Sequence, residues 1–382
     1  MPEAPSSLSG ERLGTSRSGA SLGTPRRAVV TGTAGFIGSH LALALLQYGM
    51  TVIGVDRRNA GADHIAAANL AALNDQPGFI SITADLLTCA VEPLLLDADA
   101  VFHLAGIPGV RPSWGPQFGD YVACNILATQ RIMEAATRLR VPRFVVASSS
   151  SVYGATDGTP SKETDHPRPA SPYAVTKLAE EQLCLAHAAR PDCATSVVAL
   201  RYFTVFGPRQ REDMFIHRVL TAALEGRGVG LFGDGNQRRD FTYVTDVVAA
   251  TIAAATAPAG NDVINVGGGT TTSLNEVIDI ARRLTGEPVL VEMASTRYGD
   301  VPATHADPRT ARRLLGWHPR VDLATAWPRN WTGSPPISTP PSEHMPPDYQ
   351  GNSLWKASRK PGWTPSSGAS PSASPTPSRS PP

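Results

Sequence analysis

Short, continuous apolar runs recur along the first half of the chain, and longer Ala- and Leu-rich stretches separate them. Runs of this kind, without alternating polar residues, are typical of strands that are buried on both faces of a parallel sheet. The predicted strands lie at residues 28–30, 52–55, 79–82, 100–104 and 144–147. Helices are predicted to begin near Phe36 and to cover residues 64–73, 125–139 and 172–188, with Asn125 opening or capping the third. This alternation predicts an α/β fold with a doubly wound parallel sheet.

The two ends of the chain differ from its middle. Residues 1–26 are rich in Ser, Gly and Arg without apolar periodicity, and 13 of the 34 prolines lie between residues 335 and 382. Such segments bury too little apolar surface to offset the entropy lost on ordering. We therefore expect a disordered leader over 1–26 and a disordered Pro/Ser-rich tail over 332–382.

Composition narrows the class of protein. With 41% hydrophobic residues the chain can build a sizeable core, and a net charge of +1 gives no reason to expect a nucleic-acid or membrane partner. No apolar run approaches the roughly 20 residues of a membrane span, and the first residues lack the apolar core of a signal peptide. The cysteines show no metal-ligand spacing, so we expect no metal site, ordinary buried thiols and a cytoplasmic protein. They are Cys89, Cys124, Cys184 and Cys193.

A glycine turn follows the first predicted strand, and it carries the clearest chemistry in the chain. Gly32 permits the tight turn, Gly35 lets the backbone approach a pyrophosphate, and Gly38 lets the next helix pack close to the strand. The N-terminus of that helix favours an anion. Asp56 ends the second strand, where a ribose 2′-hydroxyl is expected. This aspartate favours NAD over NADP, although two arginines that follow it, Arg57 and Arg58, keep NADP open.

Hydroxyl groups and a Tyr–Lys pair mark the ends of later elements. Four serines, Ser148–Ser151, end the strand at 144–147, at the sheet edge where ligands bind. Tyr173 and Lys177 lie four residues apart, so they share one helix face. An ammonium beside a phenol lowers the pKa of the phenol, and a nearby serine can hold a substrate oxygen during proton transfer. This pattern predicts an acid–base site.

Two other polar residues have structural interpretations on their own. Asp85 could cap the element that follows it. His103, inside the apolar run at 100–104, is expected to be a hydrogen-bonded core histidine.

Together these motifs resemble the extended short-chain dehydrogenase/reductase family, and within it the NAD-dependent nucleotide-sugar epimerases and dehydratases. The resemblance covers Ala28 to Trp327. It implies a Rossmann-type NAD-binding domain over 27–200, a mainly substrate-binding lobe over 201–331, and a homodimer. It implies that Ser149 joins Tyr173 and Lys177 in catalysis. The implied cofactor-binding residues are Gly32, Gly35, Phe36, Ile37, Gly38, Asp56, Asp85, Leu86, Leu104, Ala105, Asn125, Tyr173 and Lys177.

The second half of the chain supports the narrower resemblance. Segments 201–211, 233–244, 265–269 and 297–300 are similar to the substrate-binding segments of these enzymes. Arginines in such a lobe suit a diphosphate, because a guanidinium offers paired donors to phosphate oxygens. The resemblance implies that Arg239 and Arg297 bind the diphosphate of a nucleotide sugar. Each could instead be a solvated surface charge.

Two details distinguish among the reactions of this branch. Dehydratases carry an acidic pair after the catalytic hydroxyl and decarboxylases usually a glutamate, but this chain has Ser150 and Ser151 there. Thr204 and the pattern that ends at Arg211 resemble UDP-glucuronate 4-epimerases, in which the threonine, the serines and the arginine bind the sugar carboxylate. We therefore expect the NAD-dependent conversion of UDP-glucuronate to UDP-galacturonate through a transient 4-keto sugar.

Three alternatives stay open at this point. The chain could be a UDP-glucose/galactose 4-epimerase or a UDP-glucuronate decarboxylase. A different class of function is a non-catalytic nucleotide-sugar-binding protein on the same fold, since a fold does not determine function. The presence of Ser149, Tyr173 and Lys177 together argues against that last alternative.

Overall fold

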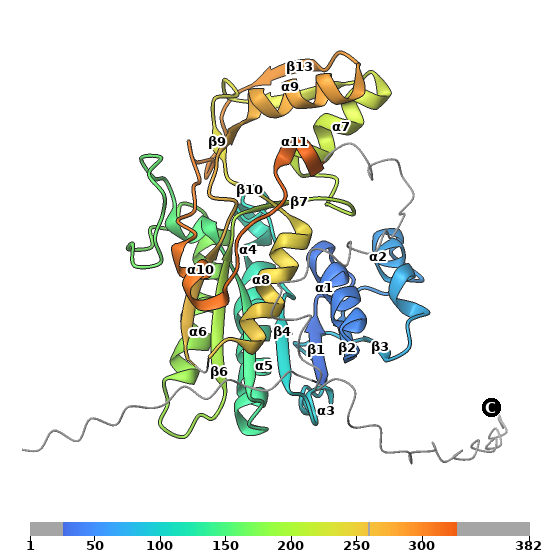
Figure 1. The fold of residues 1–382 in the computed structure, drawn as a ribbon, viewed down its shortest axis with the longest axis vertical. Helices are drawn as coiled ribbons and strands as arrows, with labels where there is room; N and C mark the ends of the chain where they lie inside the picture. The colour runs from blue at the N-terminus through green and yellow to red at the C-terminus, as the bar shows by residue number, and fades with distance from the viewer. Residues whose placement is uncertain (1–25, 259, 327–382) are drawn as a thin grey trace, which may run out of the picture. The chain divides into compact units, whose positions relative to one another are not determined.

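The computed structural model describes residues 26–258 and 260–326. A seven-stranded parallel sheet has the strand order β11-β6-β5-β4-β1-β2-β3, which confirms the predicted fold class (Figure 1). The predicted leader, apart from Arg26, and the predicted tail lie outside the described residues. The strands of the sheet are β1 (Arg27–Thr31), β2 (Thr51–Asp56), β3 (Phe79–Thr83), β4 (Ala100–His103), β5 (Arg143–Ser149), β6 (Ser196–Tyr202) and β11 (Asp262–Val266).

The central strands are apolar on both faces because both faces are covered by helices. Ala28, Val30 and Phe102 pack into one cluster of buried residues, and Val29 and Val101 pack into a second cluster. This alternation is what a period of two residues gives in a doubly wound sheet. The first face carries α1 (Phe36–Gln47), α2 (His64–Asn74), α8 (Val244–Thr256) and α10 (Arg309–Leu315). The second carries α3 (Glu92–Leu95), α5 (Ala128–Arg138) and α6 (Pro172–Ala188).

A smaller lobe has its own apolar core. Two helices pack over a parallel pair of strands, and these elements lie together at the top of the view in Figure 1. They are α7 (Phe215–Glu225), β8 (Gly228–Phe232), α9 (Leu274–Thr285) and β13 (Leu290–Ala294), joined by α11 (Leu323–Ala326). Two further strand pairs lie in the same half of the sequence. They are β7 (Thr204–Phe206) with β10 (Phe241–Tyr243), and β9 (Arg238–Arg239) with β12 (Thr272–Ser273).

The two halves of the sequence interleave in the fold. β11 and α8 come from the segment 201–331, yet β11 pairs with β6 and α8 packs on the face of the large sheet. The segment therefore contributes to the sheet as well as to the smaller lobe.

Two expectations about local structure were wrong. Asn125 lies inside a continuous helical stretch and does not open it, because α4 (Phe118–Tyr121) runs through a π-helical turn (Val122–Leu127) into α5. Its side chain bonds a neighbouring loop instead of capping a helix end. Of the four cysteines only Cys184 is buried; the other three are partly exposed, and all four are free thiols. In the described ranges no helix is long and apolar enough to cross a membrane.

Candidate active site

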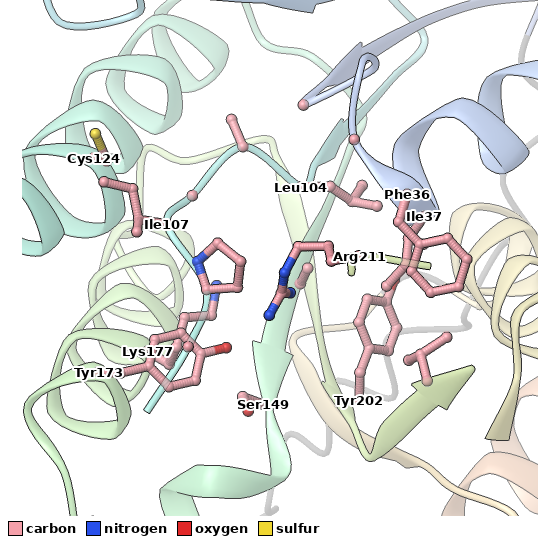
Figure 2. Close-up of a pocket in the computed structure, with 18 of the residues that line it drawn as sticks. Phe36, Ile37, Leu104, Ile107, Cys124, Ser149, Tyr173, Lys177, Tyr202 and Arg211 are labelled. Carbon is pink, nitrogen blue, oxygen red and sulfur yellow. The ribbon is translucent and has the colours of Figure 1, made fainter. Parts of the chain in front are cut away.

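A cavity of about 990 Å³ lies at the carboxyl ends of the strands (Figure 2). β1 leads to helices on one face of the sheet and its neighbour β4 leads to helices on the other, so this is the switch point at which α/β sheets bind ligands. Most of the predicted site residues line the cavity. They are Gly32, Gly35, Phe36, Ile37, Gly38, Asp56, Asp85, Leu86, Leu104, Ala105, Ser149, Ser150, Ser151, Tyr173, Lys177, Thr204, Arg211 and Arg239.

The glycine turn has the geometry that a dinucleotide needs. Gly32 has φ +73°, and a Cβ there would lie 2.9 Å from the backbone of Leu104. A Cβ on Gly38 would overlap the carbonyl oxygen of Gly32, so α1 can approach the turn only with glycine at that position. Gly35 is the N-cap of α1, and no side chain caps this end. The amides at the start of α1 are therefore not taken up by a side-chain cap, which fits an incoming pyrophosphate.

Asp56 stands at the end of β2, beside this turn. Its Oδ2 accepts the amide of Ala34 at 3.0 Å, which ties the carboxylate to the glycine turn. Arg58 donates to the same carboxylate from its backbone at 3.0 Å and from its guanidinium at 3.1 Å. Arg58 is therefore paired with Asp56, and this pairing favours a ribose hydroxyl over a 2′-phosphate at this position.

Ser149, Tyr173 and Lys177 point into the cavity from β5 and α6 (Figure 2). α6 starts at this place because the Ser171 hydroxyl caps the amide of Ala174 at 3.1 Å and Pro172 takes the first turn. Tyr173 and Lys177 then follow one turn apart. Ser149 accepts a hydrogen bond from the Ser151 hydroxyl at 2.8 Å, within the short 3-10 turn Ser150–Tyr153.

Lys177 has a second partner that sequence reasoning missed. Its Nζ donates to Glu180 Oε2, and both side chains are buried. Burial disfavours the ammonium, but Glu180 and Tyr173 more than offset this, so the pKa of Lys177 is raised. Burial raises the pKa of Glu180 to about 7 against the opposing effect of Lys177. The one signal for this ion pair in the sequence is the i,i+3 spacing of Lys177 and Glu180 on α6.

A buried network supports the strand end that carries Ser149. Ser148 Oγ donates to Glu181 at 2.6 Å, and Arg201 donates two hydrogen bonds to the same carboxylate at 2.9 and 2.6 Å. Arg201 also donates to the Tyr153 hydroxyl at 2.9 Å. The network joins β5, α6 and β6, and it holds Ser148, the residue directly before Ser149.

Two predicted residues lie off the cavity wall. Asn125 is fully buried; its Oδ1 accepts the amide of Ile107 at 2.7 Å and its Nδ2 donates to Thr176, so it braces the loop after β4. Arg297 places its guanidinium 5.2 Å from the centroid of the Phe232 ring. Arg111 stacks on the same ring at 4.0 Å and pairs with Asp300 at 3.0 Å.

His103 is the core histidine that the sequence predicted. Its two ring nitrogens bond Thr31 at 2.8 Å and Thr129 at 2.9 Å, and it is fully buried. Burial, and to a lesser degree Lys177, lowers the pKa of His103 to about 3.

The groups predicted to bind a sugar carboxylate line the same cavity. Thr204 and Arg211 line the cavity, and Arg211 points into it (Figure 2). Arg211 pairs with Asp213 at 2.9 Å on the partly exposed rim. Arg239 lines the cavity, and burial lowers its pKa. Among the described residues, no group of three or more His, Cys, Asp or Glu side chains could hold a metal ion.

Fold and cavity are those of a dinucleotide-binding protein, with Ser149, Tyr173 and Lys177 on the wall of one cavity. The chain belongs to the NAD dependent epimerase/dehydratase family, whose sequence pattern matches residues 28–267. It is 40% identical over 300 residues to a protein named uncharacterized UDP-glucose epimerase YtcB, from Bacillus subtilis (strain 168). That alignment covers 78% of this chain and 94% of the relative.

Two similar solved structures are complexes with UDP-glucuronic acid and NAD. MoeE5 in complex with UDP-glucuronic acid and NAD is 48% identical, with a TM-score of 0.73 over 78% of this chain and 96% of that one. UDP-glucuronic acid 4-epimerase from Bacillus cereus, in complex with UDP-glucuronic acid and NAD, is 39% identical. Its TM-score is 0.75 over 78% of this chain and 96% of that one.

Proposed function

We propose that the protein is an NAD-dependent 4-epimerase that interconverts UDP-glucuronate and UDP-galacturonate. One observation carries the proposal: Ser149, Tyr173 and Lys177 share a cavity with Arg211 and its neighbouring hydroxyls. The first three groups suit proton transfer at a sugar hydroxyl. Arg211 and the hydroxyls suit the C6 carboxylate, whose carbon lies two bonds from C4 of the sugar.

Each catalytic side chain has a separate task. Tyr173, as phenolate, accepts the proton of the sugar 4-hydroxyl, and Ser149 orients that hydroxyl. Lys177 stabilises the phenolate of Tyr173 by its charge and binds the nicotinamide ribose. NAD, when bound, supplies the reversible hydride acceptor for C4. The resulting 4-keto sugar turns over within the cavity, and Tyr173 returns the proton to the oxygen after C4 has regained its hydrogen on the other face.

Arg211, Thr204 and the serines have a second task in this proposal. The 4-keto form of glucuronate is a β-keto acid, which loses carbon dioxide readily when its carboxylate aligns with the carbonyl π system. Charge-assisted hydrogen bonds from Arg211 hold the carboxylate out of that alignment. Arg239 then binds the nucleotide diphosphate, and we propose the same for Arg297 after movement from its place on Phe232.

UDP-glucose is the second candidate substrate, because Arg211 already has Asp213 as a carboxylate partner. A neutral C6 hydroxymethyl group would leave that ion pair intact. We also infer a homodimer formed through α5 and α6. A cytoplasmic location is favoured because the four cysteines form no disulfide.

The experiment is product analysis by proton NMR with purified protein and no added cofactor. UDP-glucuronate and UDP-glucose are supplied in separate reactions. The proposal predicts conversion of UDP-glucuronate to its galacto isomer, with UDP-glucose unchanged. A pentose product would instead identify a decarboxylase, and conversion of UDP-glucose alone would contradict the role given to Arg211.

A further inference from the structure

Among the residues that the structure describes, Arg209 on the cavity wall is a cation without an anionic partner. It lies two residues before Arg211, in the loop between β7 and α7, and it lines the cavity together with Gly32, Gly35 and Phe36. Within the described part of the chain its guanidinium makes one hydrogen bond, to the carbonyl oxygen of Asn69 at 3.2 Å. No carboxylate of the described ranges lies within ion-pair distance of it, and burial lowers the pKa of Arg209 to about 10. A partly buried charge in this situation is stabilised when an anion arrives.

The backbone holds Arg209 in this position at an energetic cost. Its φ is +64°, in the left-handed region that side chains other than glycine rarely adopt. The loop is fastened on both sides: His40 on α1 bonds the carbonyl of Pro208 at 2.9 Å, and Gln210 bonds the carbonyl of Val205 at 3.2 Å. Burial, helped by the neighbouring Arg209, lowers the pKa of His40 to about 3, so His40 adds no competing charge.

The contacts of Arg209 place it on the dinucleotide side of the cavity. Asn69, which accepts its hydrogen bond, belongs to α2, and the Asn69 amide donates to the carbonyl of Ala34 in the glycine turn at 2.8 Å. Arg239, the candidate for the sugar-linked diphosphate, lies instead on β9 and donates to the backbone of Arg238. Of the two diphosphates that the cavity would hold, the one over the glycine turn is the nearer to Asn69 and His40.

We propose that Arg209 binds the pyrophosphate of NAD, as the side-chain counterpart of the backbone amides at the start of α1. The inference rests on the proposed function only in its choice of cofactor. Arg209 and Arg211 share one short loop, so the same backbone segment presents one arginine to the pyrophosphate and the other to the sugar.

The test compares Arg209→Gln with Arg211→Gln by calorimetric titration. The probes are NAD, ADP-ribose, adenosine and UDP-glucuronate, the last with NAD present. Loss of a charge-assisted hydrogen bond to phosphate predicts that Arg209→Gln binds NAD and ADP-ribose about 10- to 100-fold more weakly, with adenosine unchanged. Arg211→Gln is the matched control: it keeps the wild-type affinity for NAD and loses affinity for UDP-glucuronate.

Three results would overturn the inference. The first is unchanged affinity of Arg209→Gln for NAD and ADP-ribose. The second is an equal loss of affinity for adenosine, which would mean that Arg209 only supports α2. Thermal unfolding of the nucleotide-free variant checks the same point, because a supporting role predicts a lower Tm without any ligand. The third is weakened UDP-glucuronate binding with NAD unaffected. These binding measurements need no turnover, so a protein that binds NAD through Arg209 but forms no epimer would refute the proposed function alone.

Discussion

At the scale of single residues, the ammonium of Lys177 interacts with two acidic groups, the carboxylate of Glu180 and the phenol of Tyr173. Glu181 and Cys184 on the same helix are the other titratable groups that interact with Glu180, and His103 on β4 faces Lys177. Glu180 therefore competes with Tyr173 for the positive charge of Lys177. Its second oxygen, Oε1, has no partner among the described residues.

We predict that Glu180→Gln shifts the alkaline limb of the pH–rate profile to lower pH. The ammonium of Lys177 loses its anionic partner, so the pKa of Lys177 falls and its positive charge is lost at a lower pH. Below the pKa of Glu180, about 7, the carboxyl is already neutral, so glutamine leaves the acid limb of the profile in place.

The measurement is kcat/KM for epimerisation between pH 5 and 10. Glu134→Gln on the neighbouring helix is the matched control, because it removes a carboxylate that is 42% exposed. If the pH profile of kcat/KM for Glu180→Gln is lower in height but unshifted along the pH axis, the role of Glu180 is purely structural.

At the scale of elements, the Glu181–Arg201 pair joins α6 to β6 behind the serines. Its side chains are 0% and 3% exposed. Breaking such a pair leaves a buried charge without a partner, whereas replacing both members by apolar residues removes the charge altogether. Arg201→Leu is therefore expected to lower the free energy of unfolding by about 3–5 kcal/mol.

The double variant Glu181→Leu/Arg201→Leu is expected to be more stable than Arg201→Leu alone. Urea unfolding of the wild type and both variants measures the difference. If the double variant is the less stable of the two, the pair contributes through packing and hydrogen bonds more than through its balanced charges.

Some features of these elements follow from the local sequence, and others depend on contacts that the fold creates. The apolar runs predicted β1 to β5, because burial of a strand between two layers of helices favours continuous apolar residues, and Ser171-Pro172 predicted the start of α6. They did not predict β6 and β11, which complete the large sheet. The π-helical turn at Asn125 left no such signal, because it depends on a bond from Asn125 to a loop 18 residues earlier in the chain. The partners of Lys177 and Arg297 likewise depend on which side chains the fold brings near.

At the scale of the whole molecule, the switch point between β1 and β4 brings together residues from both halves of the chain. The glycine turn comes from the first 40 residues and Arg211 from the second half. Their meeting in one cavity follows from the strand order, which the local pattern did not predict beyond its class. The central claim is that C4 of the sugar loses and regains its own hydrogen within this cavity.

The most direct test of that claim is the fate of a label at C4. UDP-glucuronate with deuterium at C4 is converted by the purified protein in ordinary water, and the product is examined by NMR and mass spectrometry. We expect the galacto isomer to keep its deuterium at C4, because the hydrogen returns to the carbon that it left without reaching solvent. A product with ordinary hydrogen at C4 would contradict hydride transfer within a closed site and with it the mechanism assigned to Ser149, Tyr173 and Lys177.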